Sequence, residues 1–536
     1  MPADIEGFWQ FDRVHAPRPL TPLSQDVLLP AFGEGMTAGL EEVGYPHGLV
    51  MRAVNNFAYL GIVVSRERGE ALQQQLAAHQ RAVASLIPQL ADLWRRDWLP
   101  SILPGLERLR TFDFGSLSDA TLIGELADLR VELASRWRIH GRILPIYLAV
   151  SDFEDFYRAR LNPTDPTEPY VLLHGFPTRA LDSSRGLWLL SRLAAASPVA
   201  RMFQDSVPER VAEVLAQTPG DDAFRGELRR YLDSFGWRND AIFELADPMW
   251  FEDATRPLAA IQHQLALTPD ADPDIQLVRS ARARDELVRQ ARVRMAEDPA
   301  VLARFDELYS HALPYLEIDE DHNFYIDQMG NAGMRRPILE IGSRIARRGC
   351  IAAPEDVFLL HIDEIEAAMS GTDHRASVAA RRAELRRSAA MSPPDALGTP
   401  PADNLADPLL AALSKQDTTP GAGGASSTCV ITGTPASRGV VSGHARVASS
   451  LREACAVQPG EVLVCEMTLP TWTPLFSSIA AVVSDTGGVL SHCAIVAREC
   501  GIPCVVGTLV GTRTITNGML LTVDGSRGTV QIHGDR

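Results

Sequence analysis

Leucine stripes at helical spacing dominate the first 390 or so residues of the chain. One stripe recurs at steps of three, four or seven from Leu72 to Leu93, and another runs from Leu122 to Leu133. Such spacing aligns apolar side chains on one face of an α-helix, where they pack as core. Further helices are expected over residues 281–297 and around Ile338 to Ile345. The pattern predicts a mostly α-helical region.

The composition changes after residue 391. Paired prolines come first, and a run rich in glycine, alanine and serine follows. Proline stiffens a chain and glycine with serine loosens it, so this stretch is typical of a linker. We therefore expect a helical domain over residues 1–391, a flexible linker over 392–428, and a domain over 429–536 that moves as a unit.

Beyond the linker the pattern becomes strand, helix and turn in short alternation. Short β-branched runs bounded by Gly, Asp or Pro predict buried strands at residues 462–464, 481–483, 504–506, 520–523 and 529–532. One helix is expected from Ser491 to Glu499. The predicted fold class is thus multidomain, with a mostly α-helical region followed by a C-terminal α/β domain.

Length and composition agree with this division. A chain of 536 residues is too long for one hydrophobic core, and 46% hydrophobic with 22% charged residues excludes wholesale disorder. The net charge of -17 opposes attraction to nucleic acid or anionic lipid. The sequence contains no apolar run long enough to span a bilayer, and its acidic start does not resemble a secretory signal. We therefore expect a cytoplasmic protein without nucleic-acid or membrane partners.

The cysteines do not indicate a disulfide framework. There are seven, and six of them fall in the last hundred or so residues. An odd number in a reducing compartment favours small buried side chains. Cys493, Cys500 and Cys504 lie near His492, but they lack the paired Cys-x-x-Cys spacing of zinc sites. No metal is expected.

Candidate chemistry is concentrated around His492. The strand that ends at Ser484 is followed by two glycines, and a helix then begins at Ser491 and His492. Unpaired N–H groups and the positive end of the helix dipole favour an anion at this point. A neutral imidazole is a nucleophile near pH 7, and its phosphoramidate remains reactive towards a second acceptor. Hydroxyl groups of Thr486 and Ser491 suit the phosphoryl oxygens.

The segment from Thr486 to Gly507 reads T-G-G-x-x-S-H-x-A-I-V-A-R-E-x-G-I-P-x-V-V-G. It resembles the phosphohistidine signature of phosphoenolpyruvate synthase, pyruvate phosphate dikinase and rifampin phosphotransferase. Residues 433–447 and 468–474 are similar to the entry and active-face segments of the same domain. The resemblance implies a swivelling phosphohistidine domain in which His492 carries the phosphoryl group. The residues expected to bind that group are Thr486, Gly487, Gly488 and Ser491.

A second resemblance covers the middle of the chain. Residues 235–252, 324–335 and 349–364 are similar to the helical acceptor-binding region of rifampin phosphotransferase-like proteins. That family usually has a Gly-His-Arg motif where this chain has Trp237 in place of the histidine. The resemblance implies that residues 1–391 bind the acceptor, or substrate. Candidates to meet it or the phosphohistidine are Arg238, Glu244, Arg335 and Arg336, with solvated or ion-paired helix faces as the alternative.

The sequence shows no glycine-rich lid with basic clamps of the ATP-grasp type. We therefore expect no cofactor in this chain, with ATP and Mg²⁺ on a separate ATP-grasp partner that phosphorylates His492. The predicted function is a phosphotransferase component that relays the phosphoryl group to a small-molecule hydroxyl.

Two other functions compete with this one. The first is a dehydratase or lyase of a biosynthetic intermediate, with His492 acting through a phosphorylated intermediate or as general acid or base. The second is a non-catalytic module, against which the joint presence of five polar and glycine identities argues. The acceptor is left open, because helices rich in Leu, Trp and Phe line pockets and form bundle cores alike.

Overall fold

The computed structural model describes residues 7–63, 69–217, 222–399, 408–413, 415, 424–427, 430–468 and 470–533. The chain divides into two compact units, each built from three separate segments. Unit 1 comprises Met1–Pro145, Trp237–Met249 and His322–Ala406, and unit 2 comprises Ile146–Gly236, Trp250–Asp321 and Asp407–Arg536. The domain boundaries expected from the sequence at residues 391 and 429 stay a prediction.

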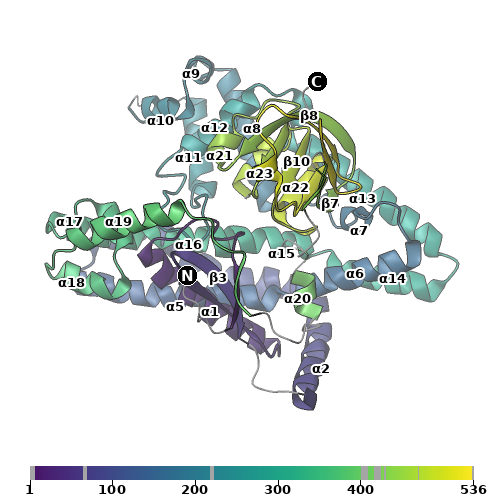
Figure 1. Cartoon of the computed structure of the whole chain (residues 1–536), viewed down its shortest axis with the longest axis horizontal. Coiled ribbons are helices and arrows are strands. Elements are labelled where there is room, and N and C mark those ends of the chain that lie inside the picture. The colour runs from purple at the N-terminus through teal and green to yellow at the C-terminus, as the bar shows by residue number, and fades with distance from the viewer. Residues whose placement is uncertain are drawn as a thin grey trace. The chain divides into compact units, whose positions relative to one another are not determined.

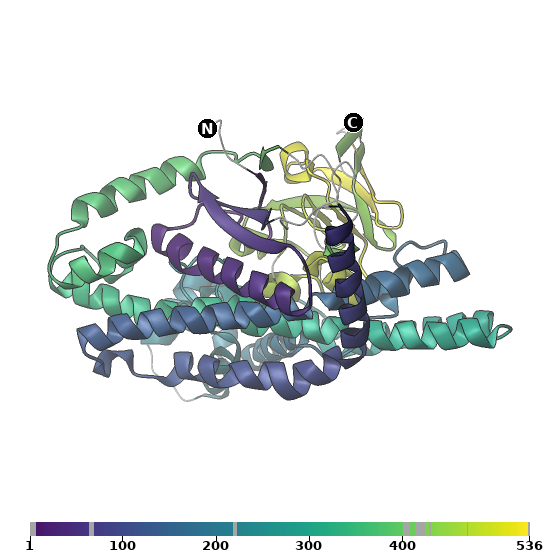
Figure 2. The same ribbon diagram turned by 90° about the horizontal axis from the view of Figure 1, so that it is seen from below.

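Unit 1 is centred on two long helices, α1 (Pro22–Glu42) and α5 (Asp119–Ile143). The Ser118 side chain caps α5 by accepting a hydrogen bond from the Thr121 backbone N–H at 3.2 Å. The predicted leucine stripe of α5 is fully buried. A Cβ on Gly39 of α1 would lie 2.1 Å from the carbonyl oxygen of Arg138, so glycine permits this close helix contact. Figure 2 shows the two helices running beside each other.

A small sheet in unit 1 was not expected from the sequence. Its strands run in the order β2 (Gly48–Val54), β3 (Phe57–Val63), β1 (Phe8–Phe11) and β4 (Ala396–Gly398), all antiparallel. The β2–β3 turn is made by Asn55 and Asn56, both with positive φ (51° and 67°), as a two-residue hairpin turn requires. β2 packs on α1.

The other main helices of unit 1 confirm that the remaining stripes are helical, but the first stripe is only partly core. Its Val83 and Leu90 are buried, whereas Leu72, Leu76, Leu86 and Leu93 are half-buried. Pro88 interrupts this stripe, which is divided between α2 (Gly69–Leu86) and α3 (Leu90–Leu93). Ile338, Ile341 and Ile345 are fully buried in α17. The longer remaining helices include α4 (Leu99–Thr111), α17 (Arg335–Arg347), α18 (Ile365–Met369), α19 (Arg375–Ala389) and the π-helix η5 (Asn323–Gly330), and several shorter helical turns lie between them.

Unit 2 combines helices with the C-terminal sheet. Its helices before the sheet are α6 (Pro145–Leu161), α7 (Glu168–Val171), α8 (Arg179–Ala195), α9 (Val199–Asp205), α10 (Pro208–Gln217), α11 (Ala223–Phe235), α12 (Thr255–Leu265), α13 (Pro273–Met295), α14 (Pro299–Ala312) and α15 (Tyr315–His322). The helix predicted over residues 281–297 is the second half of α13. Three short helices follow in the C-terminal region, α20 (Pro408–Leu413), α21 (Leu451–Ala454) and α23 (Gly511–Thr514).

Nine described strands form one mixed sheet in the order β5-β6-β13-β12-β8-β9-β10-β11-β7. The central strands β8, β9, β10 and β11 are parallel, and the flanking pairs are antiparallel. Their bounds are β5 (Gly424–Ser427), β6 (Val430–Thr432), β7 (Thr434–Ser437), β8 (Val440–Ala448), β9 (Val462–Cys465), β10 (Ala481–Ser484), β11 (Cys504–Val506), β12 (Leu520–Asp524) and β13 (Thr529–His533). The helix α22 (His492–Cys500) joins β10 to β11 and packs on the sheet (Figure 1).

The fold class expected from the sequence is confirmed: the chain is multidomain and mostly helical, with a C-terminal α/β region. All five predicted strands and the predicted helix are present. In the part of the chain that the structure describes, no helix combines the length and the apolar character needed to cross a bilayer.

The predicted linker is only partly described. Residues 400–407, 414, 416–423 and 428 lie outside the described residues. The described parts include strand β4, which pairs with β1 in unit 1, and helix α20 and strand β5 in unit 2. Lys415 forms an ion pair with Glu154 of α6 at 2.5 Å. The linker therefore contains ordered pieces between its proline-rich and glycine-rich stretches.

Replacing Gly525 by alanine should destabilise unit 2. A Cβ there would lie 1.9 Å from the Ser437 carbonyl oxygen and 2.7 Å from the Cys504 backbone nitrogen, so backbone has to shift. We expect a loss of about 3 kcal/mol in the free energy of unfolding, measured by urea denaturation. The control Gly226→Ala, in α11, adds a Cβ that meets only the flexible Arg230 side chain, at 3.9 Å, and should gain about 0.5–1 kcal/mol. Equal stability of the Gly525 variant and the wild type would contradict this close approach of the backbone at Gly525 to the backbone at Ser437 and Cys504.

Candidate functional site

His492 is the first residue of α22 and follows the carboxyl end of the parallel strand β10. Ligands of α/β sheets bind at this edge, outside the ends of parallel strands. Ser491 is the N-cap of α22, and its side chain accepts a hydrogen bond from the Ala494 backbone N–H at 3.4 Å. Gly487 has φ +96°, and a Cβ on it would lie 2.8 Å from the Ser491 hydroxyl oxygen. Glycine is therefore needed for the turn that positions the cap and the histidine.

Both ring nitrogens of His492 have side-chain partners in unit 2. Nδ1 lies 3.2 Å from Oε1 of Glu320 in α15, and Nε2 lies 3.1 Å from the hydroxyl oxygen of Thr473. The His492 side chain is 14% exposed and that of Glu320 only 6%. The Tyr315 hydroxyl, one turn before Glu320, donates to the Leu490 carbonyl oxygen at 3.1 Å. The ring is thus held in a fixed orientation with part of it still open to solvent.

This arrangement selects one form of the imidazole. A neutral ring that donates its Nδ1 proton to the Glu320 carboxylate carries its lone pair on Nε2. Nε2 is then the nucleophile, and the Thr473 hydroxyl marks the space that an electrophile would take. A carboxylate at Nδ1 also stabilises the positive charge that the ring gains when Nε2 reacts. The site can therefore support nucleophilic or acid–base chemistry at Nε2.

The predicted phosphoryl-binding residues surround the start of α22. The Thr486 hydroxyl donates to the Glu466 carbonyl oxygen at 2.9 Å, and the Ser491 backbone N–H donates to the Gly488 carbonyl oxygen at 3.1 Å. In this structure the hydroxyl proton of Thr486 is therefore used in a hydrogen bond that stabilises the loop before α22. The phosphoryl-binding roles of Thr486, Gly487, Gly488 and Ser491 stay predictions.

The acceptor-site candidates lie in unit 1, where Glu244 and Arg335 hold one loop. Glu244 is buried, and its carboxylate accepts hydrogen bonds at 2.7–2.8 Å from the Thr21 N–H and hydroxyl, the Ser24 hydroxyl and the Ala246 N–H. Arg335 donates to the carbonyl oxygens of Leu245 and Ala246, both at 2.9 Å. These contacts stabilise residues 244–246, and an acceptor role stays a prediction.

Arg336 and Arg238 are placed differently. Arg336 donates to carbonyl oxygens at the end of α4, including that of Arg110 at 2.7 Å, and its guanidinium lies 5.7 Å from the Trp237 ring centroid. Arg238 is 2% exposed and stands over Phe324 at 5.9 Å. The tryptophan that replaces the family's histidine thus packs under an arginine. Acceptor roles for both arginines stay predictions.

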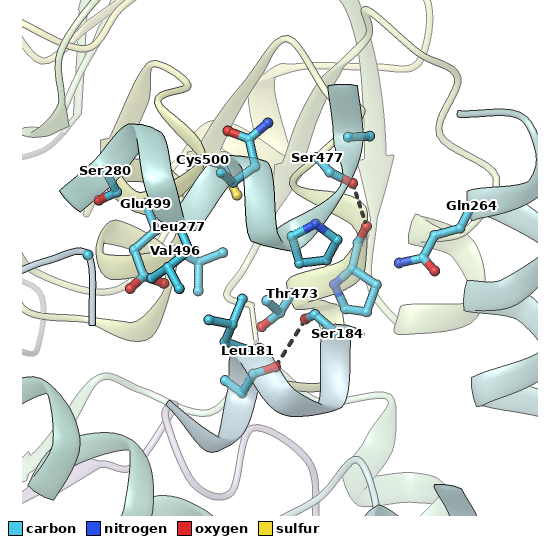
Figure 3. Close-up of a pocket in the computed structure, with 16 residues that line it drawn as sticks. Leu181, Ser184, Gln264, Leu277, Ser280, Thr473, Ser477, Val496, Glu499 and Cys500 are labelled. Carbon is cyan, nitrogen blue, oxygen red and sulfur yellow. Dashed lines mark hydrogen bonds between the residues drawn. The ribbon is translucent and has the colours of Figure 1, made fainter. Parts of the chain in front are cut away.

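A cavity of about 60 Å³ lies beside the histidine in unit 2. Thr473, the partner of His492, belongs to its wall, and so do Val496 and Glu499 of α22. Figure 3 shows Leu277, Val496 and Glu499 grouped toward one end and Gln264 at the other. The wall is mainly apolar, with a few polar groups, and the volume is far below the roughly 300–1,000 Å³ of small-molecule sites, so in this structure the cavity could hold only a few water molecules.

Near the end of α22, Arg498 is buried and its neighbour Glu499 is half-buried, with 25% of its side chain exposed. Burial raises the pKa of Glu499 to about 8, and the charge of Glu320 adds to the shift while Arg498 opposes it. Arg498 donates to the Ala436 carbonyl oxygen at 2.7 Å and stands 5.2 Å from the Tyr170 ring centroid. Burial lowers the pKa of Arg498. Glu499 therefore retains a proton near neutral pH beside the histidine site.

The six cysteines that the structure describes are free thiols. Cys493 and Cys504 are buried, and their sulfur atoms lie 3.9 Å apart. Both thiols are accommodated in the core between α22 and β11.

Residues 457–528 match the family model of the PEP-utilising enzyme mobile domain. The chain carries this mobile domain. His492 and all four predicted phosphoryl-binding residues lie inside the matched range. Residues 171–317 match the rifampicin phosphotransferase fourth domain, which ends three residues before Glu320 and includes the helical wall of the cavity.

Relatives extend the similarity over the whole chain. Chondramide synthase cmdD of Chondromyces crocatus is 34% identical over 99% of this chain and 14% of its own length. The uncharacterized phosphotransferase YvkC of Bacillus subtilis is 28% identical over 99% of this chain and 62% of its own length. Rifampicin phosphotransferase of Streptomyces sviceus is 30% identical over 59% of this chain and 35% of its own length. The chain thus spans less than two thirds of each of these relatives.

Sequence reasoning did not identify Glu320, the carboxylate that contacts His492. The residue lies in the acidic run Glu317-Ile318-Asp319-Glu320-Asp321, 172 positions before the histidine. The only signal was this cluster of carboxylates at the end of a helical segment. Thr473 belongs to the segment 468–474 that the sequence had marked as similar to the active face.

Replacing Glu499 by glutamine should change how stability depends on pH. The folded protein keeps the Glu499 proton up to pH of about 8, while the unfolded chain loses it near pH 4.3, so this group costs stability increasingly as pH rises between those values. Glu499→Gln should therefore be more stable than the wild type by about 1–3 kcal/mol at pH 9 and no more stable at pH 4. Thermal unfolding at both pH values measures the difference. A gain of equal size at the two pH values would contradict a raised pKa.

Proposed function

We propose that the chain is a phosphotransferase component in which His492 relays a phosphoryl group to the hydroxyl of a small molecule. The orientation of the ring between Glu320 and Thr473 is the observation that carries the proposal. It leaves Nε2 as the nucleophile at the edge of the sheet where α/β proteins bind ligands. The family match over residues 457–528 and the phosphotransferase names of two relatives support a phosphotransferase-type enzyme.

The relay has two balanced steps. In the first, Nε2 attacks the γ-phosphorus of ATP, an N–P bond forms, the P–O bond to the β-phosphate breaks, and ADP leaves. The Nδ1–H···Glu320 contact stabilises the charged ring. In the second step, the oxygen of the acceptor hydroxyl attacks the same phosphorus, the N–P bond breaks, and the hydroxyl proton passes to a base. The imidazole returns to its first state.

The first step requires an ATP site. We propose that a separate ATP-grasp protein binds ATP and Mg²⁺ and presents the γ-phosphate to His492. Metal ions neutralise the charge that spreads over the phosphate oxygens in such transfers. The mobile-domain match supports a histidine that moves between two sites.

Dehydration or elimination is a second candidate, favoured by one observation. The His492–Glu320 pair is also suited to move a proton directly, and Glu499 nearby retains its own proton near neutral pH. In a dehydration or elimination, the His492 ring would remove a proton from a biosynthetic intermediate or donate one to it, with or without prior phosphorylation of that intermediate. Product mass separates the two functions, because transfer adds a phosphate group and elimination removes water.

Phosphorylation of His492 is directly testable. The protein is incubated with radiolabelled ATP, Mg²⁺ and an ATP-grasp protein encoded beside its gene, and label that is stable in alkali and lost in acid is counted. His492→Asn should take up none. Glu320→Gln, which keeps the shape but loses the charge, should label about tenfold more slowly, equivalent to about 1.4 kcal/mol. The control His444→Asn, at an exposed position of the central strand β8 in the same domain, should label normally. Equal labelling of the His492 variant would contradict the relay.

A further inference from the structure

Three metal-ligating side chains meet in the interior of unit 1. They are His140 of α5, His322 at the end of α15 and Asp327 of the π-helix η5. One ligand atom from each lies within 4.8 Å of the other two. His140 Nδ1 is 3.1 Å from Asp327 Oδ1, and His322 Nε2 is 3.9 Å from Asp327 Oδ2. Their side chains are only 10%, 6% and 2% exposed.

The backbone brings His322 and Asp327 to the same face. They are five positions apart in the sequence, which would place them on different sides of an α-helix. Residues 323–330 form a π-helix, in which hydrogen bonds run from each residue to the fifth one along and such residues align. π-helical turns are rare and are frequently found at functional sites. The irregular turn therefore assembles the His–Asp pair, and α5 adds His140 from the other side.

The donor set is selective in its chemistry. Two imidazole nitrogens and one carboxylate oxygen suit first-row divalent transition metals, whereas Mg²⁺ and Ca²⁺ prefer oxygen ligands throughout. Zinc sites with three protein ligands use this kind of set and keep a further position open. Metal–ligand bonds of about 2.0–2.2 Å separate tetrahedral ligand atoms by roughly 3.4 Å. The observed separations, 3.1 Å from His140 to Oδ1 and 3.9 Å from His322 to Oδ2 of Asp327, are close to that value, with one carboxylate oxygen toward each imidazole.

Aromatic side chains pack around His140 and restrict the orientation of its ring. The Trp137 ring is fully buried and stacks on His140 at 5.0 Å with an angle of 20° between the planes. Phe243 stacks on the other side of Trp137 at 5.6 Å. Aromatic packing of this kind fixes the orientation of a ligating imidazole and excludes water from the metal.

Two charged side chains near the cluster are already paired with other groups. His15 is paired with Asp12 at 2.9 Å, and Arg136, one turn before His140, is paired with Glu132 at 3.1 Å. The Asp327 carboxylate therefore carries the negative charge available to a bound ion.

We propose that His140, His322 and Asp327 bind one first-row divalent transition-metal ion, with Zn²⁺ the leading candidate. The site lies in unit 1, and the proposal does not depend on the proposed relay at His492. It also departs from the sequence prediction, which considered only the C-terminal cysteines and expected no metal. The loop that carries Phe243 also contains Arg238 and Glu244, so an ion at this site would stabilise the segment resembling an acceptor-binding region.

Metal titration of the full chain, without a histidine affinity tag, tests the proposal. Protein stripped with a chelator is titrated with Co²⁺ and separately with Zn²⁺, and bound metal is measured after gel filtration. We expect one equivalent of tightly bound metal, a visible Co²⁺ spectrum of nitrogen and oxygen ligands, and a higher melting temperature with Zn²⁺. Asp327→Asn and His322→Gln should each weaken binding about 10- to 100-fold or more.

Controls separate this site from others. His361→Gln removes a second His–Asp pair of unit 1, in which Nδ1 lies 3.0 Å from Asp26, and it should bind metal normally. Cys493→Ser should also bind normally. Failure of the folded wild type to bind one equivalent would overturn the proposal whatever the variants do. Thiolate charge-transfer bands with Co²⁺, or equal binding by the folded Asp327 variant, would overturn it as well.

Discussion

The hydrogen bonds at the two nitrogens of His492 are the constraint on which the candidate site depends. A carboxylate at Nδ1 and a hydroxyl at Nε2 leave the ring one orientation and one reactive atom. The neighbouring elements position the ring: Gly487 makes the turn, Ser491 caps the start of the helix, and β10 ends at the edge of the sheet. The sheet and the helix α15 therefore have to be built together before the imidazole has a defined chemistry.

Local pattern was sufficient to predict most of the C-terminal α/β region. Runs such as Val462–Cys465 and Cys504–Val506 are buried on both faces, and continuous β-branched stretches are the expected signature of such strands. The helix that begins at His492 was predictable because serine caps and glycine turns are local signals. The hairpin β2–β3 was missed, since its turn is made by two asparagines and its strands carry no strict alternation of apolar and polar residues.

Long-range contacts were not predictable in this way. Glu320 meets His492 across 172 positions, and nothing in its own neighbourhood distinguishes it from the other carboxylates of the run 317–321. The cluster of His140, His322 and Asp327 could not be recognised in the sequence for a related reason. A spacing of five has no meaning in α-helical or strand periodicity, so the pair gains significance only when a π-helix is known to be present. The sequence singled out Glu244 and Arg336 as charged candidate residues. It could not predict which groups they contact, because those partners are brought together by tertiary structure.

The contacts of Lys415 have a consequence for how the mobile domain would behave. Its ammonium group pairs with Glu154 and lies 2.9 Å from the Ser151 hydroxyl, while its carbonyl oxygen accepts the Leu490 N–H at 2.8 Å, two residues before the histidine. A swing of the domain under the proposed relay has to release these bonds first. Together with the Glu320–His492 and Tyr315–Leu490 hydrogen bonds, the contacts of Lys415 would then lengthen the lifetime of the docked state, and rising ionic strength would weaken the contribution of the Lys415–Glu154 pair.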